Sequence, residues 1–133
     1  MSLQKKNIIL ADKMKLLGDL VDIDGGSFWT IKAIRSASKT IRNLDLPIDS
    51  VSDLTVLPGI GKGISKKIKE YLTTGYIQEL VDLEVTYPIE ALTMTVVPGI
   101  GVKTAFKYHD KGICNFDDLV KASEEGKIKN ENI

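Results

Sequence analysis

Two short stretches of this sequence carry glycines and a lysine at a spacing suited to binding anions. The first runs from Thr55 to Lys62 and the second from Thr95 to Lys103, and each contains the tetrad Pro-Gly-Ile-Gly. Proline disfavours an α-helical conformation for the residue before it, so a helix that reaches the tetrad should end there. Glycine permits a positive φ and lets another backbone approach closely. The sequence therefore predicts a tight turn that occurs twice.

The residues after each tetrad predict a new helix whose first N–H groups can bind a phosphate. A lysine-bearing segment of helical pattern follows Gly61, and another follows Gly101. A helix N-terminus offers unpaired N–H groups and the positive end of the helix dipole, and both favour phosphate oxygens. We interpret Ile60 and Ile100 as plugs between the helices rather than ligand contacts. The alternative is a simple turn between packed helices, but two copies with helical flanks argue against it.

Positive charge is concentrated in the helix expected after each tetrad. Residues 62–75 contain Lys62, Lys66, Lys67 and Lys69 against Glu70, and residues 99–112 contain Lys103, Lys107 and Lys111 against Asp110. The segments before them, 43–53 and 76–98, contain acidic residues and no basic ones. The net charge is zero, but this distribution places basic side chains where a phosphate backbone would lie. A solvated surface remains the alternative for either cluster alone.

Cys114 and His109 are the remaining side chains that could carry chemistry. One cysteine excludes an internal disulfide framework and fits a reducing intracellular compartment. Neither another cysteine nor a second histidine accompanies Cys114, so the sequence gives no sign of a zinc site there. His109 has no partners for a catalytic triad. We therefore interpret Cys114 as a small residue at the edge of the core and His109 as a surface residue.

The elements that must position these residues are all helical, since no strand-like alternation of apolar residues is found. The apolar spacing and the helix-ending residues predict helices over 7–21, 28–43, 50–58, 62–74, 77–85, 88–95, 102–111 and 115–124. Ser50 and Asp53 resemble a capping box at the start of the third. Pro88 suits the first position of a helix, so we expect a boundary between two helical domains, 1–87 and 88–133. The sequence predicts an all-α fold of two small units, each built around one tetrad.

The composition is that of a globular protein. The chain has 133 residues, of which 43% are hydrophobic and 27% charged, enough for one domain or two small ones. No apolar run approaches the length of a membrane span, and the lysine-rich start lacks the features of a signal peptide. We expect an intracellular protein without a membrane partner, located in the cytoplasm and nucleoid or in the nucleus.

Each tetrad with its flanks resembles a helix-hairpin-helix motif, a unit that binds the DNA backbone. We call Thr55–Lys62 hairpin one and Thr95–Lys103 hairpin two. The whole order resembles the N-terminal part of family X DNA polymerases, the group that includes polymerase beta. The resemblance covers nearly the whole chain and rests on the segment from Trp29 to Ser38, the run from Leu57 to Gly75, and the later run from Gly99 to Leu119.

This resemblance implies a division of labour between the two expected domains. Residues 1–87 would form the small N-terminal domain, which grips the 5′-phosphate of gapped DNA, and residues 88–133 the DNA-binding subdomain. The polymerase palm, with its three metal-binding carboxylates, would follow Ile133. Asp22 and Asp24 do not reproduce the palm signature, because the Gly-Ser pair follows them instead of preceding them. We therefore expect no polymerase activity from this chain.

The resemblance also assigns roles at both hairpins. DNA phosphates would be held by Gly59, Gly61, Lys62 and Lys66 at hairpin one and by Gly99, Gly101, Lys103 and Thr104 at hairpin two. A monovalent cation, K⁺ or Na⁺, would bind main-chain carbonyls at each hairpin, those of Thr55, Leu57 and Ile60 and those of Thr95, Val97 and Ile100. No organic cofactor is implied.

Lys67 matches the lysine with which the family removes a 5′-deoxyribose phosphate through a Schiff base. Such a nucleophile must be deprotonated, and a position beside Lys66 at the edge of the apolar face would favour the neutral amine. The other residues of the family's pocket are replaced here by Gly63, Ile34 and Thr30. We therefore favour a non-catalytic, sequence-independent, monomeric module for gapped or nicked DNA. A lyase that uses Lys67 and a helical protein-interaction module are the alternatives.

Overall fold

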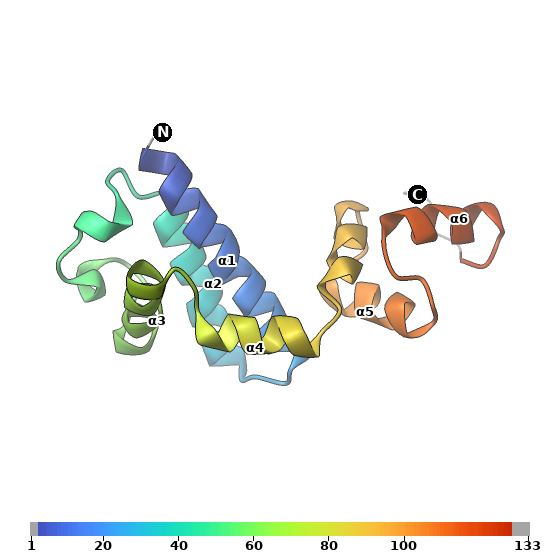
Figure 1. Ribbon diagram of the computed structural model, residues 1–133, viewed down its shortest axis with the longest axis horizontal. Coiled ribbons are helices and arrows are strands. Elements are labelled where there is room, and N and C mark those ends of the chain that lie inside the picture. The colour runs from blue at the N-terminus through green and yellow to red at the C-terminus, as the bar shows by residue number, and fades with distance from the viewer. Residues whose placement is uncertain (1–2, 129–133) are drawn as a thin grey trace. The chain divides into compact units, whose positions relative to one another are not determined.

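The computed structural model describes residues 3–128, and these residues form helices and connecting loops without strands (Figure 1). The α-helices alternate with three short 3₁₀ helices, labelled η. Their bounds are α1 Leu3–Ile23, α2 Phe28–Arg42, η1 Ile48–Ser50, η2 Leu54–Val56, α3 Lys62–Thr74, α4 Gln78–Thr86, η3 Ile89–Val96, α5 Val102–Asp110 and α6 Phe116–Glu124. The predicted all-α class is confirmed. Among the described residues, no helix has both the length and the apolar character needed to cross a bilayer.

The chain divides into two compact units, Met1–Leu83 and Glu84–Ile133. The division falls inside α4, whereas the sequence placed a boundary after Tyr87. Each unit contains one hairpin and its own buried apolar residues.

Unit 1 is built on the pairing of α1 with α2, which lie side by side (Figure 1). Leu10, Met14 and Leu17 of α1 and Ile34 and Ile41 of α2 are completely buried, as their helical spacing predicts. Ser27 caps α2, since its side-chain oxygen accepts a hydrogen bond from the N–H of Thr30. This cap fixes where α2 begins and therefore how its first residues are presented.

A buried asparagine connects α1 to the segment that leads toward hairpin one. The side chain of Asn7 is fully buried, donates to the carbonyl of Leu46 at 2.8 Å and accepts from the N–H of Ile48 at 3.0 Å. Both polar ends of the amide are thereby satisfied inside unit 1, which removes the cost of burying it.

The segments before the hairpins differ from the prediction, because they are 3₁₀ and not α-helical. The capping box predicted for Ser50 and Asp53 is wrong: Ser50 ends η1 and donates to the carbonyl of Pro47, while Asp53 caps η2. Extended backbone at Val51 separates the two short helices.

The helix after hairpin one agrees with the prediction at both ends. α3 spans Lys62–Thr74, and Gly75 ends it with a left-handed φ of 87°. In unit 2, Met94, Ala105 and Leu119 are completely buried, and the ring of Tyr87 stacks on that of Phe106 at 5.8 Å. The last helix begins where the sequence predicts it, and Asn115 caps it, because its side chain accepts from the N–H of Asp118 at 2.9 Å.

Candidate nucleic-acid interface

Both tetrads form the same tight turn. The N–H of Ile60 donates to the carbonyl of Leu57 at 3.2 Å, and the N–H of Ile100 donates to that of Val97 at 3.0 Å. The glycine after each proline, Gly59 or Gly99, has a φ of 76° or 90°. Proline followed by a residue of positive φ is the signature of a type II turn, which demands glycine at that point. Ile60 and Ile100 are each only 4% exposed, so their interpretation as plugs is confirmed.

The second glycine of each tetrad has a different conformation from the first. Gly61 has a φ of −93° and Gly101 a φ of −88°, an extended backbone that any residue adopts. A Cβ added at either position would meet no described atom within 4 Å. Both glycines of each tetrad permit a positive φ, but only the first of each pair uses it. Neither backbone strain nor internal packing accounts for glycine at these two positions.

These two glycines are the N-cap residues of α3 and α5. Neither helix has a side-chain cap or an acidic residue in its first turn, in contrast to α2 and α6, which Ser27 and Asn115 cap. The first N–H groups of an α-helix have no partner within the helix. Both hairpins therefore present a helix N-terminus that carries no side chain of its own over the N-cap, which leaves room for an anion.

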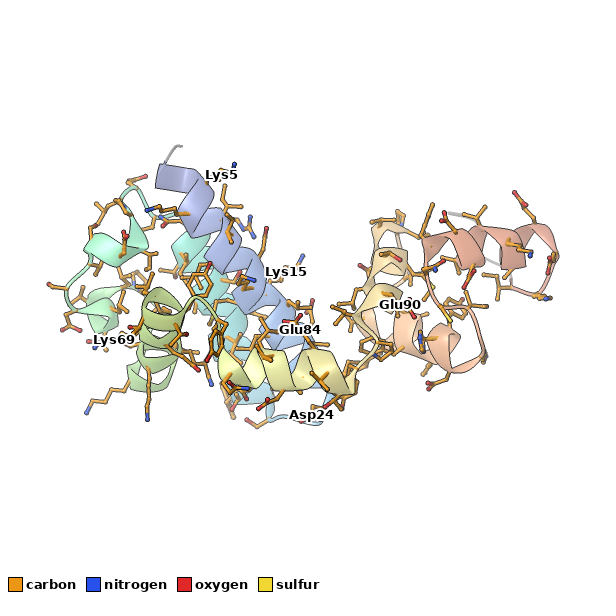
Figure 2. All side chains as sticks on the ribbon, viewed as in Figure 1. Lys5, Lys15, Asp24, Lys69, Glu84 and Glu90 are labelled. Carbon is orange, nitrogen blue, oxygen red and sulfur yellow. The ribbon has the colours of Figure 1, made fainter. Side chains whose placement is uncertain are left out.

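The lysines of α3 divide into two groups. Lys62, Lys66 and Lys69 are exposed, and Figure 2 shows Lys69 projecting from α3. Lys67 is half-buried, with 28% of its side chain exposed. In unit 2, Lys103 is exposed and Thr104 half-buried in the first turn of α5. These four exposed lysines therefore lie on the helices that begin at the two N-cap glycines.

Lys67 lies at a hollow between α2 and hairpin one. The hollow encloses about 390 Å³ and is lined by Trp29, Thr30, Ala33, Ile34, Gly59, Gly61, Gly63, Ile64 and Lys67. The residues that the sequence assigned to a depleted lyase pocket, Gly63, Ile34 and Thr30, do gather around Lys67. Its Nζ forms an ion pair with the Glu79 carboxylate at 2.5 Å. Glu79 was not among the residues expected there, because it lies on the next helix.

Comparison with known protein families agrees with this geometry. A model described as a helix-hairpin-helix domain matches residues 5–77, more than half of the chain, and one described as a SAM-like helix-hairpin-helix tandem matches residues 90–129. The chain belongs to the helix-hairpin-helix family.

Several proteins similar to this chain are DNA polymerases. The DNA polymerase/3′-5′ exonuclease PolX of Bacillus subtilis is 27% identical over 128 residues, which cover 96% of this chain and 22% of the relative. DNA polymerase lambda of Arabidopsis thaliana is 33% identical over 79% of this chain and 20% of its own length. DNA-directed DNA/RNA polymerase mu of Homo sapiens is 26% identical over 85% of this chain and 23% of its own length. The chain thus spans about a fifth of these relatives, and it has the character of the N-terminal region of a family X DNA polymerase.

Nothing in the sequence indicated an exposed aromatic pair, Phe28 and Trp29, of which Trp29 lines the Lys67 hollow. Trp29 is 73% exposed and Phe28 is 67% exposed, with their rings edge to face at 5.2 Å. The Nζ of Lys32 lies 5.6 Å from the centre of the Trp29 ring. An aromatic next to a helix start is ordinarily assigned to the core, and only the structure reveals this exposure. Two bare rings beside a cation form a surface on which a flat, electron-rich ring can stack.

Of the carbonyls assigned to cation binding, those of Thr55 and Thr95 lie in η2 and η3, and the others lie in the two turns. Those of Leu57 and Val97 each accept the turn hydrogen bond described above. A carbonyl oxygen has two lone pairs, so this bond leaves one for a cation. The turn bond therefore does not by itself exclude the predicted ion, which stays a prediction.

Proposed function

We propose that this chain binds the sugar-phosphate backbone of gapped or nicked DNA as a monomer, without reading the bases. The observation that carries the proposal is the pair of N-cap glycines, Gly61 and Gly101. Nothing within the described chain requires glycine at either position, yet both helix starts have it. A ligand that must approach the backbone closely accounts for both.

The ligand at each hairpin is a phosphate group. The uncapped first turns of α3 and α5 supply N–H donors, and Lys62 and Lys103 are the first or second residues of these helices. Exposed Lys66 adds a positive charge one turn further along α3. Contacts to phosphates fix the position of a protein on DNA but carry no sequence information directly. Binding is therefore independent of sequence.

The preference for a gap rests on the aromatic pair beside hairpin one. Trp29 shares the Lys67 hollow with Gly59 and Gly61, so a strand held at hairpin one passes close to an exposed ring. Bases in an intact duplex are already stacked, whereas an unpaired base has a free face and gains about 1–3 kcal/mol from stacking on an aromatic side chain. A gap offers an unpaired base next to a phosphate end, a nick offers the phosphate end alone, and blunt duplex offers no unpaired base.

The proposal includes a monovalent cation at each hairpin. K⁺ or Na⁺ would bind the carbonyls of Thr55, Leu57 and Ile60 and those of Thr95, Val97 and Ile100, and would offset part of the charge of an approaching phosphate. At constant ionic strength, replacing K⁺ and Na⁺ by a bulky organic cation should weaken DNA binding. Equal affinity in both solutions would remove the ion from the proposal.

The decisive experiment compares DNA structures by fluorescence anisotropy. We expect gapped or nicked duplex with a 5′-phosphate to bind more tightly than blunt duplex, and log affinity to fall linearly with log salt. Trp29→Ala should remove most of the gap preference while affinity for blunt duplex changes little. Equal affinity for gapped, blunt and single-stranded DNA would contradict the structural preference. Absence of any salt-dependent binding would instead favour a protein-interaction module.

The contribution of single charges can be measured in the same assay. Lys66→Ala should reduce the salt slope by about one, the effect of one lost phosphate contact. Lys15→Ala is the matched control, because Lys15 is exposed on α1 and takes no part in either hairpin (Figure 2). If both substitutions reduce the slope equally, the chain has a diffuse charge effect and not a hairpin site.

A further inference from the structure

Unit 2 brings the one histidine and the one cysteine of this chain together with a glutamate. The Nε2 of His109 lies 3.2 Å from the Oε1 of Glu90. One ligand atom from each of Glu90, His109 and Cys114 can be chosen such that all three lie within 4.8 Å of one another. The residues come from η3, where Figure 2 labels Glu90, from the last turn of α5, and from the loop before α6. Glu90 is distant in sequence from His109 and Cys114, so the cluster exists only in the folded chain.

We propose that Glu90, His109 and Cys114 bind a divalent transition-metal ion, with Zn²⁺ the best match. Thiolate sulfur, imidazole nitrogen and carboxylate oxygen are the three ligand types that zinc uses in proteins. Mg²⁺ and Ca²⁺ prefer oxygen ligands throughout, so a set with sulfur and nitrogen disfavours them. The three residues lie outside both hairpins and do not require bound DNA, so the proposal is independent of the proposed function.

The spacing of the three side chains suits a tetrahedral ion. Bond lengths of about 2.0–2.3 Å at tetrahedral angles place two ligand atoms about 3.4–3.6 Å apart. The Nε2 of His109 and the Oε1 of Glu90 are already at 3.2 Å, and all three ligand atoms lie within 4.8 Å of one another, so a bound ion would draw the Sγ of Cys114 away from the carbonyl of Gly112 and toward the other two. Three protein ligands leave the fourth position for water or another small ligand. The thiol of Cys114 releases its proton to solvent as its sulfur binds the metal.

The loop that carries Cys114 is held in place by hydrogen bonds on both sides. The N–H of Ile113 donates to the carbonyl of Tyr108 at 2.9 Å, and the N–H of Cys114 donates to the Asp118 carboxylate at 3.0 Å. The N–H of Phe116 donates to the hydroxyl of Thr93, which itself donates to the carbonyl of Glu90. The backbone on either side of the cluster is thereby fixed to η3, α5 and α6. A bound ion would connect these three elements and steady the helix that follows hairpin two.

Titration with Co²⁺, a spectroscopic substitute for Zn²⁺, tests the proposal in the full chain without a histidine tag. A bond between a thiolate and Co²⁺ produces a charge-transfer band in the near ultraviolet, and in this chain only Cys114 can supply the thiolate. We expect this band to saturate at one Co²⁺ per chain and to disappear when Zn²⁺ is added. Zn²⁺ should also raise the Tm of unit 2, because it binds the folded state.

Variants separate a three-residue site from a thiol that binds metal by itself. Even the loss of a residue that only supports a metal ligand lowers affinity by about 10–100-fold, so His109→Gln and Glu90→Gln should each cost at least about tenfold. Glu124→Gln, an exposed glutamate of α6 outside the cluster, is the matched control and should bind Zn²⁺ as the unmodified chain does. No charge-transfer band in the unmodified chain, or a band that His109→Gln and Glu90→Gln both leave unchanged, would overturn the proposal.

Discussion

Replacing Gly61 by serine should make the free protein more stable and its DNA binding weaker. Gly61 is the N-cap of α3, with a φ of −93° and a ψ of −171°, the extended backbone that N-cap serine adopts. A Cβ at this position meets no described atom within 4 Å, so the new side chain fits without strain. Its hydroxyl can accept a hydrogen bond from an N–H of the first turn, which lacks a side-chain cap. The serine hydroxyl would therefore occupy an N–H donor of the first turn that we assign to a phosphate.

The two effects have opposite signs and measurable sizes. Serine caps a helix better than glycine by a few tenths of a kcal/mol. Removing a glycine from a position without strain lowers the entropy of the unfolded chain and adds about 0.4–1 kcal/mol. A total of about 1 kcal/mol raises the Tm of a unit of this size by about 4–8 °C. A hydrogen bond to a charged group contributes about 1.5–3 kcal/mol, so its loss should weaken DNA binding by about 10- to 100-fold.

The assay combines calorimetry of the free protein with fluorescence anisotropy on one gapped duplex at fixed salt. Gly61→Ala is the matched control, because alanine adds a Cβ without an acceptor and so separates obstruction from capping. Gly101→Ser tests the same reasoning at α5, where φ is −88°. A serine variant that is stabilised and yet binds DNA as tightly as the unmodified chain would refute phosphate binding at this helix start. A destabilised variant would show that the N-cap geometry itself is wrong.

Three further predictions concern the first hairpin. Gly59→Ala should lower the free energy of unfolding by about 1–2 kcal/mol in urea denaturation, because Gly59 has a φ of 76°. If Gly61→Ala lowered the free energy of unfolding as much, the distinction between the two glycines would be contradicted. Borohydride trapping on an abasic 5′-phosphate substrate should yield little adduct, because Lys67 pairs with Glu79 and its hollow is lined by Gly63, Ile34 and Thr30. Efficient trapping that Lys67→Arg abolishes would instead make the chain a lyase, because the guanidinium of arginine stays protonated. Hydrogen bonds from the hydroxyl and then the N–H of Thr55 hold the pKa of Asp53 below its ordinary value of 3.8. The contribution of Asp53 to stability is therefore full above pH 3.8 and is lost as the pH falls through the lowered pKa. Asp53→Asn should reduce the acid sensitivity of the urea midpoint in that range, and an unchanged dependence of the midpoint on pH would exclude the effect.

Local signals in the sequence were enough to predict the class of fold and much of the hairpin geometry. The bounds of α3 follow from a proline and glycines before it and from Gly75 after it, all of which act within a few residues. The cap at Asn115 is local in the same sense. Prediction was weaker where two local rules compete. Ser50 and Asp53 fit the spacing of a capping box, but they belong to two separate 3₁₀ turns in the structure.

Contacts between distant residues could not be read from the sequence. Glu79 pairs with Lys67 only because α4 follows α3 through a turn that brings the two side chains together. Trp29 has the residue type of a core position, and its exposure depends on where Ser27 starts α2. The approach of Glu90 to His109 likewise depends on how η3 packs against α5.

A feature that the two hairpins share strengthens the case for an external ligand. In hairpin one, the hydroxyl of Thr40 donates to the carbonyl of Pro58 at 2.7 Å. Just before hairpin two, the hydroxyl of Thr93 accepts from the N–H of Phe116 at 3.0 Å. Internal contacts of this kind hold the backbone of each unit in place. What the two hairpins share is the turn together with Gly61 or Gly101, whose side-chain positions face open space. A feature that occurs in both units, and that packing requires in neither, is best explained by what binds there.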